Sequence, residues 1–315
     1  MREQQIQDIA KFLEEVQKFY HEGDLKKAIE LLEKGEPVIH AENFDEYLKI
    51  QFYLLYSEIL VVSILMENKD FGLATEKLQI CDKIILDSQS LESARLNIQY
   101  AIAWDYKPIS NPEEKIENLN IAIDYIIKAI EILEVVKNTK YLSMAYFYRG
   151  LFFERWDQLE EASIWYNNSY QLAKNTNNPI EMSFAGRHLG FLEIRKGELE
   201  NAEKFLVESL KLRDDVGFKI GVPFSILSLG DLHARNKDYQ KAMEFYKSGY
   251  EAALKIGLKM AMAIGYISIG RTFIRLEQFN ESVPYLEKGI ELAEKVNNQE
   301  LASLARKTLE TKSVG

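Results

Sequence analysis

Four arginines recur at intervals of 40 residues from the middle of the chain onward, each five positions after a glycine. They are Arg155, Arg195, Arg235 and Arg275. Arginine grips a carboxylate through two parallel hydrogen bonds and stacks on aromatic rings, whereas lysine is a flexible point charge. The column therefore predicts a surface that binds anionic groups. The alternative is that a basic residue in the last turn of a helix only offsets the helix dipole.

The residue types that perform catalysis or bind metals show no productive spacing. The histidines are His21, His40, His188 and His233, and none lies four residues from another. The sequence has no glycine-rich phosphate loop and no nucleophile motif. The single cysteine, Cys81, lies beside Leu78 and Ile80 and is expected to be a buried structural thiol. We therefore expect no catalytic residue, no metal site and no cofactor.

The composition argues against several other classes of protein. The 315 residues are 47% hydrophobic and 28% charged, which suffices for a buried core, and the formal net charge is −10. A surplus of acidic groups, all of it within the first 140 residues, opposes binding to a phosphate backbone. No basic start precedes an apolar run, and the most apolar stretch, 59–66, falls short of the ~20 residues that span a bilayer. We expect a cytoplasmic protein without a nucleic-acid or membrane partner.

A repeat of 40 residues underlies the arginine column. Four columns are in phase with it: Gly150, Gly190, Gly230 and Gly270; Ala162, Ala202, Ala242 and Ser282; Tyr166, Leu206, Tyr246 and Leu286; Asn177, Gly217, Gly257 and Asn297. The first two columns predict positions where two helices cross closely, and the third fills the groove between them. The fourth suits the left-handed residue that ends a helix. Each unit is thus a helix, a short turn, a second helix and a short link.

The residues of these units resemble the tetratricopeptide repeat. Leu189-Gly190 precedes Ala202-Glu203-Lys204-Phe205-Leu206, and Leu229-Gly230 precedes Ala242-Met243-Glu244-Phe245-Tyr246, as in that family's Leu-Gly and Ala-x3-aromatic pattern. A 40-residue version is similar to the repeats of kinesin light chains, cell-polarity adaptors and peptide-sensing regulators of Gram-positive bacteria. The usual first-helix tryptophan and the terminal proline are absent, which leaves the subfamily open.

Looser units precede the regular ones. The segments 23–28 and 69–74 resemble 197–202, the turn into a second helix, and Ala122 begins another second helix after an insertion at 107–114. We predict an all-α chain, a right-handed solenoid of about seven antiparallel helix pairs plus a C-terminal capping helix. It would be a single superhelical domain, 1–315, with looser repeats at 1–138, regular repeats at 139–298 and the cap at 299–311.

The resemblance implies that the first helices of the pairs line a concave groove. The inward positions lie three before and one, four and five after each repeat glycine. They predict a ligand-binding groove that includes Arg155, Arg187, Arg195, Arg235, Arg271, Arg275, Phe147, Leu151, Phe191 and Asp231. For the apolar members the alternative is packing against the preceding helix pair. The two-carboxylate clamp of chaperone-binding repeats is disfavoured, because it needs asparagine and lysine where this chain has Leu151, Phe191, Asp231 and Arg271.

These observations favour a non-enzymatic adaptor or scaffold that binds a protein or peptide segment with acidic and apolar side chains. One alternative is a peptide-responsive signal receptor that changes its superhelical pitch, and another is a structural protein that associates with itself. Regulators of this type that act on promoters have a helix-turn-helix domain before their repeats. Here the second helix of the first repeat begins near Asp24, which leaves room for one helix before it.

Overall fold

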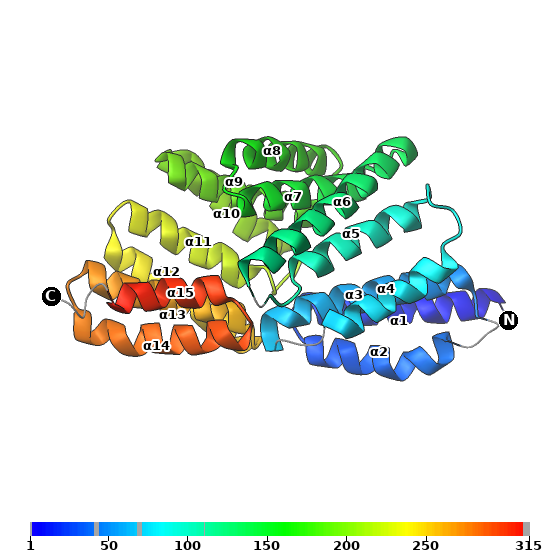
Figure 1. Ribbon diagram of the computed structural model, residues 1–315, viewed down its shortest axis with the longest axis horizontal. Helices are drawn as coiled ribbons and strands as arrows, with labels where there is room; N and C mark the ends of the chain where they lie inside the picture. The colour runs from blue at the N-terminus through cyan, green and yellow to red at the C-terminus, as the bar shows by residue number, and fades with distance from the viewer. Residues whose placement is uncertain (1, 41–43, 68–70, 110, 311–315) are drawn as a thin grey trace. The chain divides into compact units, whose positions relative to one another are not determined.

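The computed structural model describes residues 2–40, 44–67, 71–109 and 111–310. Within those ranges the chain forms fifteen α-helices and no strand (Figure 1). The helices are α1 (Arg2–Glu22), α2 (Leu25–Ile39), α3 (Glu46–Glu67), α4 (Phe71–Ile84), α5 (Leu91–Asp105), α6 (Pro112–Val136), α7 (Thr139–Arg155), α8 (Leu159–Asn175), α9 (Pro179–Lys196), α10 (Leu199–Asp215), α11 (Val222–Arg235), α12 (Tyr239–Lys255), α13 (Lys259–Arg275), α14 (Phe279–Lys295) and α15 (Gln299–Glu310). The predicted all-α fold of about seven helix pairs and a final helix is confirmed. Lys69, Asp70, Ser110 and position 311 of the predicted cap lie outside the described residues.

Short turns fold successive helices into antiparallel pairs. Residues 156–158 join α7 to α8, residues 236–238 join α11 to α12, and residues 276–278 join α13 to α14. The helices of each of these pairs pack directly on one another, as do those of the pairs α5–α6 and α9–α10. We call the earlier helix of a pair its first helix and the later one its second helix.

The repeat glycines lie where the two helices of a pair are closest, as predicted. A β-carbon at Gly150 would be 2.7 Å from the Tyr166 ring and 3.2 Å from the Ala162 carbonyl oxygen. At Gly230 the Tyr246 ring would be only 2.5 Å away. Contacts this short do not occur between real atoms, so any larger residue would push the two helices apart.

Two columns of left-handed residues end the helices. The predicted column at the ends of second helices is confirmed, since Asn177, Gly217, Gly257 and Asn297 have φ of 52°, 69°, 69° and 54°. A second column follows the first helices at Asp157, Gly197, Lys237 and Glu277, with φ of 58°, 88°, 63° and 61°. The sequence did not indicate the second column, because only one of its members is glycine.

The start of α9 has a proline but no side-chain cap. Pro179 is its first residue, and the Asn178 side chain makes no capping hydrogen bond. The insertion at 107–114 is only partly as expected. α5 ends at Asp105 before it, but α6 begins at Pro112, inside the insertion, and not at Ala122 as predicted, because Pro112 fits the first turn of a helix. Asn111 caps α6, since its Oδ1 accepts a hydrogen bond of 2.8 Å from the Glu114 N–H.

The contacts divide the chain into two compact units. Unit 1 comprises residues 1–64 and 69–177, and unit 2 comprises residues 65–68 and 178–315. In unit 1 the first helices α5 and α7 contact each other directly, and in unit 2 α11 contacts both α9 and α13. The first helices within a unit therefore lie next to one another in a row. The expectation that residues 1–315 form a single domain stays a prediction.

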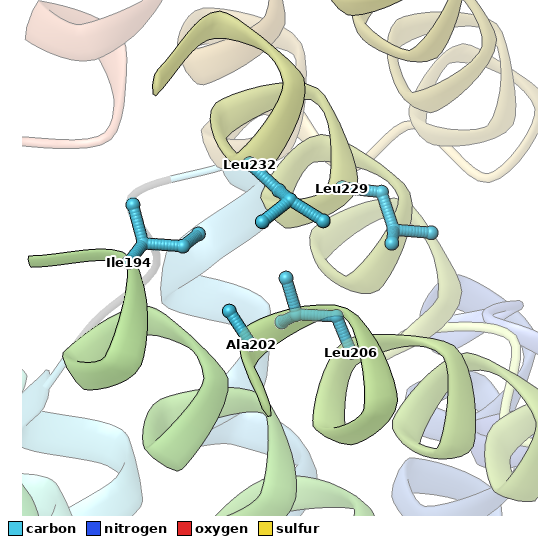
Figure 2. Packing of buried hydrophobic residues seen from close by; sticks show 5 residues of the cluster. All are labelled: Ile194, Ala202, Leu206, Leu229 and Leu232. Carbon is cyan, nitrogen blue, oxygen red and sulfur yellow. The ribbon is translucent and has the colours of Figure 1, made fainter. Parts of the chain in front are cut away.

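Aliphatic side chains from three consecutive helices form the core of unit 2 at its regular repeats. Figure 2 shows Ile194 of α9, Ala202 and Leu206 of α10, and Leu229 and Leu232 of α11 converging on one another. None is more than 7% exposed. Each leucine buried in this way contributes roughly 1.5–3 kcal/mol to folding. The second helix of one pair thus joins the first helices of its own and the next pair.

The helix α15 covers the end of unit 2. Ala302 packs with Leu292 and Ala293 of α14, and Ala305 packs with Leu286 of α14 and Ile267 of α13. Leu301 and Leu309 support these contacts, whereas Leu304 is exposed. The predicted capping role follows from this one-sided burial.

The helix α3 is more apolar than the sequence reading indicated. Its window Glu46–Met66 has the length and composition to cross a membrane, well beyond the stretch 59–66. However, 72% of this window is buried inside the protein. A helix buried on nearly all sides is apolar all round for the same reason as a membrane span.

Candidate functional site

The predicted arginine column lies at the C-terminal ends of four first helices. Arg155, Arg235 and Arg275 are the last residues of α7, α11 and α13, and Arg195 is the last but one of α9. Arg195, Arg235 and Arg275 are exposed, and the Arg155 side chain is 31% exposed. The helix dipole favours a cation at each of these positions. The position alone therefore does not separate a binding role from a capping role.

Arg155 forms an ion pair with a carboxylate of its own chain. Its Nε lies 2.7 Å from Oδ1 of Asp105, and its Nη2 donates to Oδ2 over 2.8 Å. Asp105 is the last residue of α5, the preceding first helix. Burial raises the pKa of Asp105, and the Arg155 charge opposes that rise. The pair shows that the ends of adjacent first helices are close enough for a two-pronged ion pair.

The corresponding helix ends of unit 2 hold arginine at every position. Arg195, Arg235 and Arg275 end α9, α11 and α13, which contact one another in sequence. Where α5 and α7 of unit 1 end in Asp105 and Arg155, the helices α9, α11 and α13 of unit 2 each have an arginine in the last or last-but-one position. A row of like charge is unfavourable by itself and creates a positive potential for an anionic group.

A partly buried carboxylate lies on α11, about one helical turn before Arg235. Asp231 of α11 is partly buried, and its Oδ1 accepts a hydrogen bond of 2.8 Å from the Tyr246 hydroxyl of α12. Burial raises the pKa of Asp231 to about 6, against the opposing effects of the Tyr246 hydrogen bond and the charges of Arg271 and Arg187. The predicted residues Arg187, Asp231 and Arg271 therefore interact electrostatically across α9, α11 and α13.

Arg187 links α9 to α11. Its Nη1 donates to the Ser228 hydroxyl over 3.4 Å, and its Nη2 lies 2.6 Å from Nε2 of His188. Arg187 is partly buried and His188 is buried, whereas Arg271 is exposed. The two arginines near Asp231 therefore differ in exposure: Arg187 on α9 is partly buried, and Arg271 on α13 is exposed.

The predicted apolar residues differ in exposure. Phe147 is only 6% exposed, and its ring centroid lies 5.7 Å from that of Tyr166 on α8. It is therefore buried against the second helix of its own pair, whereas the alternative reading placed such residues against the preceding pair. Leu151 and Phe191 are partly exposed and remain candidates for ligand contact.

The sequence reading missed the tyrosines that hold the carboxylates. Tyr246 donates to Asp231, and Tyr166 donates to Glu154 over 2.6 Å. The repeats with leucine in place of Tyr166 have Ile194 and Ile274 in place of Glu154. A tyrosine in the third repeat column with an acidic residue 12 or 15 positions before it was therefore a usable signal.

The described residues contain no evident set of metal ligands. No group of three or more histidine, cysteine, aspartate or glutamate side chains comes together in that part of the chain. Burial raises the pKa of the Cys81 thiol to about 12, which keeps it protonated and unreactive at neutral pH. The geometry instead offers hydrogen bonds and charges to a ligand.

Comparison with known proteins agrees with this architecture. Residues 225–255 and 263–296 match the family model of the tetratricopeptide repeat. No curated protein with significant sequence similarity was found.

Several solved structures share the fold. A Rap protein complexed with competence and sporulation factor has a TM-score of 0.70 at 14% identity, over 95% of this chain and 80% of its own. NprR in complex with its cognate peptide NprX has a TM-score of 0.65 at 15% identity, over 97% and 85%. Aspartyl phosphate phosphatase F from Bacillus subtilis has a TM-score of 0.53 at 13% identity, over 96% and 93%. The segments 225–255 and 263–296 therefore match tetratricopeptide repeats, and the structural similarities show an all-α solenoid fold.

Proposed function

We propose that the protein binds a peptide or protein segment with acidic and apolar side chains along the first helices of unit 2. We call this surface the first-helix face and define it by Arg187, Phe191, Arg195, Asp231, Arg235, Arg271 and Arg275. The observation that carries the proposal is the replacement of an aspartate–arginine pair in unit 1 by a row of arginines at the helix ends of unit 2. An acidic partner would bring carboxylates to those helix ends.

The relatives by fold support a peptide as the partner. The Rap protein and NprR were both solved with a bound peptide factor. Three residues predicted for the groove lie in unit 1 and are not part of the first-helix face. Arg155 is paired with Asp105, Phe147 is buried, and Leu151 remains a candidate.

Charge reversal on the face tests the proposal. The probe is a library of random heptapeptides, divided into an acidic, a neutral and a basic sublibrary. We expect the acidic sublibrary to bind the wild type most tightly. Arg195→Glu combined with Arg235→Glu should weaken that binding by about tenfold or more, because attraction becomes repulsion. A matched control, Lys211→Glu combined with Lys247→Glu, places the same charges on exposed positions of α10 and α12. Equal effects of the two double variants would refute the proposal.

We also propose that the protein acts without catalysis and resides in the cytoplasm. One relative by fold is described as a phosphatase, so the direct test is hydrolysis of acetyl phosphate by the purified protein. Turnover above the rate in buffer would contradict the non-enzymatic assignment.

Self-association, the structural alternative, would appear as a concentration-dependent increase of mass in sedimentation.

A further inference from the structure

Arg213 is the most unusual residue of unit 2. It lies on α10 at a position where the neighbouring repeats have Ala173, Ala253 and Ala293. Those alanines are fully buried, and the Arg213 side chain is buried to the same extent, with 1% exposed. One repeat therefore places a guanidinium where its relatives place a methyl group.

Neutral groups surround this guanidinium. Its Nε donates to the Ser183 hydroxyl over 3.1 Å, and its Nη1 donates to the Gly221 carbonyl over 2.5 Å and to the Ser225 hydroxyl over 2.9 Å. The carbon of the guanidinium lies 4.9 Å from the centroid of the Phe184 ring. These contacts satisfy hydrogen bonds but supply no negative charge.

No carboxylate of the described residues forms an ion pair with Arg213. Burial lowers the pKa of Arg213, and the positive charge of Arg187 lowers it further. A buried cation without a counter-charge is costly, and replacing such a group by an apolar one is often neutral or stabilising. The alanines of the other repeats show that the fold does not require a charge here.

The surrounding chain is adapted to Arg213. A β-carbon at Gly221 would lie 2.7 Å from Cδ of Arg213, so glycine is needed there. The helix α11 begins at Val222, three residues later in the repeat than α13 does at Lys259. Phe218 precedes that late start and packs edge-on against Phe184, with ring centroids 5.6 Å apart. Arg213 thus lies where α9 and the start of α11 meet.

We propose that Arg213 determines the specificity of the first-helix face by favouring an acidic group of the bound segment beside Phe184 and Arg187. The inference rests on the proposed function and adds a location for one carboxylate of the partner. In a low-dielectric surrounding the charge acts over several ångströms, so it needs no direct contact with the ligand. Arg187 adds a second positive charge on the same helix as Phe184.

Removal of the charge, with an unbranched apolar side chain in its place, tests the inference. The probes are the acidic heptapeptide sublibrary and an isosteric sublibrary with asparagine and glutamine in place of aspartate and glutamate. For Arg213→Met, we expect the affinity ratio between the two sublibraries to fall by about tenfold relative to the wild type. The matched control is Lys211→Met, the same change of net charge at an exposed position two residues away on α10. Its ratio should equal that of the wild type.

Additional variants separate this effect from a folding defect and from failure of the proposed function. Arg213→Met should retain the helical circular dichroism and the thermal midpoint of the wild type, and Arg213→Lys should retain part of the acidic preference. An unchanged ratio in Arg213→Met, with charge reversal at Arg195 and Arg235 still effective, would overturn this inference alone. Failure of the wild type to bind either sublibrary would overturn the proposed function as well.

Discussion

Asp231 is held by one tyrosine and lies within the field of two arginines. The Tyr246 hydroxyl donates to it, and the charges of Arg271 and Arg187 favour its ionised form. Burial nevertheless dominates and raises its pKa to about 6. A carboxylate kept ionised at neutral pH in such a place costs folding free energy, which is common at functional sites.

This cost predicts a pH dependence of stability. The folded protein holds the Asp231 proton more tightly than the unfolded chain, whose pKa is near 3.8. The contribution of Asp231 to stability is therefore greatest below pH 4 and is lost as the pH rises to about 6. Asp231→Asn should remove this loss and raise the unfolding free energy at pH 7 by about 1–3 kcal/mol.

Urea unfolding of both proteins between pH 4 and pH 7 measures the effect. The amide oxygen introduced by Asp231→Asn would still accept the hydrogen bond of the Tyr246 hydroxyl, so the variant isolates the charge. Asp215→Asn, at an exposed position of α10, is the control. Parallel pH curves for the wild type and Asp231→Asn would contradict the assigned pKa.

At the scale of the helix, the turns between first and second helices determine how each pair closes. Asp157, Lys237 and Glu277 adopt a left-handed conformation that is strained for residues with a β-carbon, and only Gly197 fits without strain. The space around Gly197 is open, so the backbone angle alone matters at this position.

Two substitutions at these turns should have opposite effects. Lys237→Gly relieves the left-handed strain and should stabilise the protein by about 0.5–1 kcal/mol. Gly197→Ala introduces the same strain and should destabilise it by about 1 kcal/mol. Thermal or urea unfolding measures both changes, and effects of the same sign would show that contacts other than the backbone angle dominate.

For the whole molecule, the question is whether binding changes its shape. Some relatives by fold are solved with bound peptides, and a receptor of this kind would transmit binding through a rearrangement of its helices. If the protein is a peptide-responsive receptor, its radius of gyration in small-angle scattering should change when the tightest-binding acidic heptapeptide is added. An unchanged radius with peptide bound would favour the adaptor interpretation.

The sequence alone determined the helix pairs and their spacing. Gly150 and Gly230 recur because helices cross closely there, and Asn177 and Gly257 recur because they end helices in a left-handed conformation. Such requirements act on single positions and repeat with every unit. A 40-residue period therefore exposes them without any knowledge of the tertiary structure.

Only the tertiary structure decided which charged residues find an opposite charge or a hydrogen-bond partner within the protein. Arg155 and Arg235 occupy the same column of the sequence repeat. Asp105, however, forms its ion pair with Arg155 and lies 50 residues before it in the chain. Likewise, the sequence does not show which groups accept the hydrogen bonds of Arg213, because its hydroxyl and carbonyl partners come from α9 and from the start of α11. Charge compensation depends on distances across helices, and a one-dimensional repeat does not contain them.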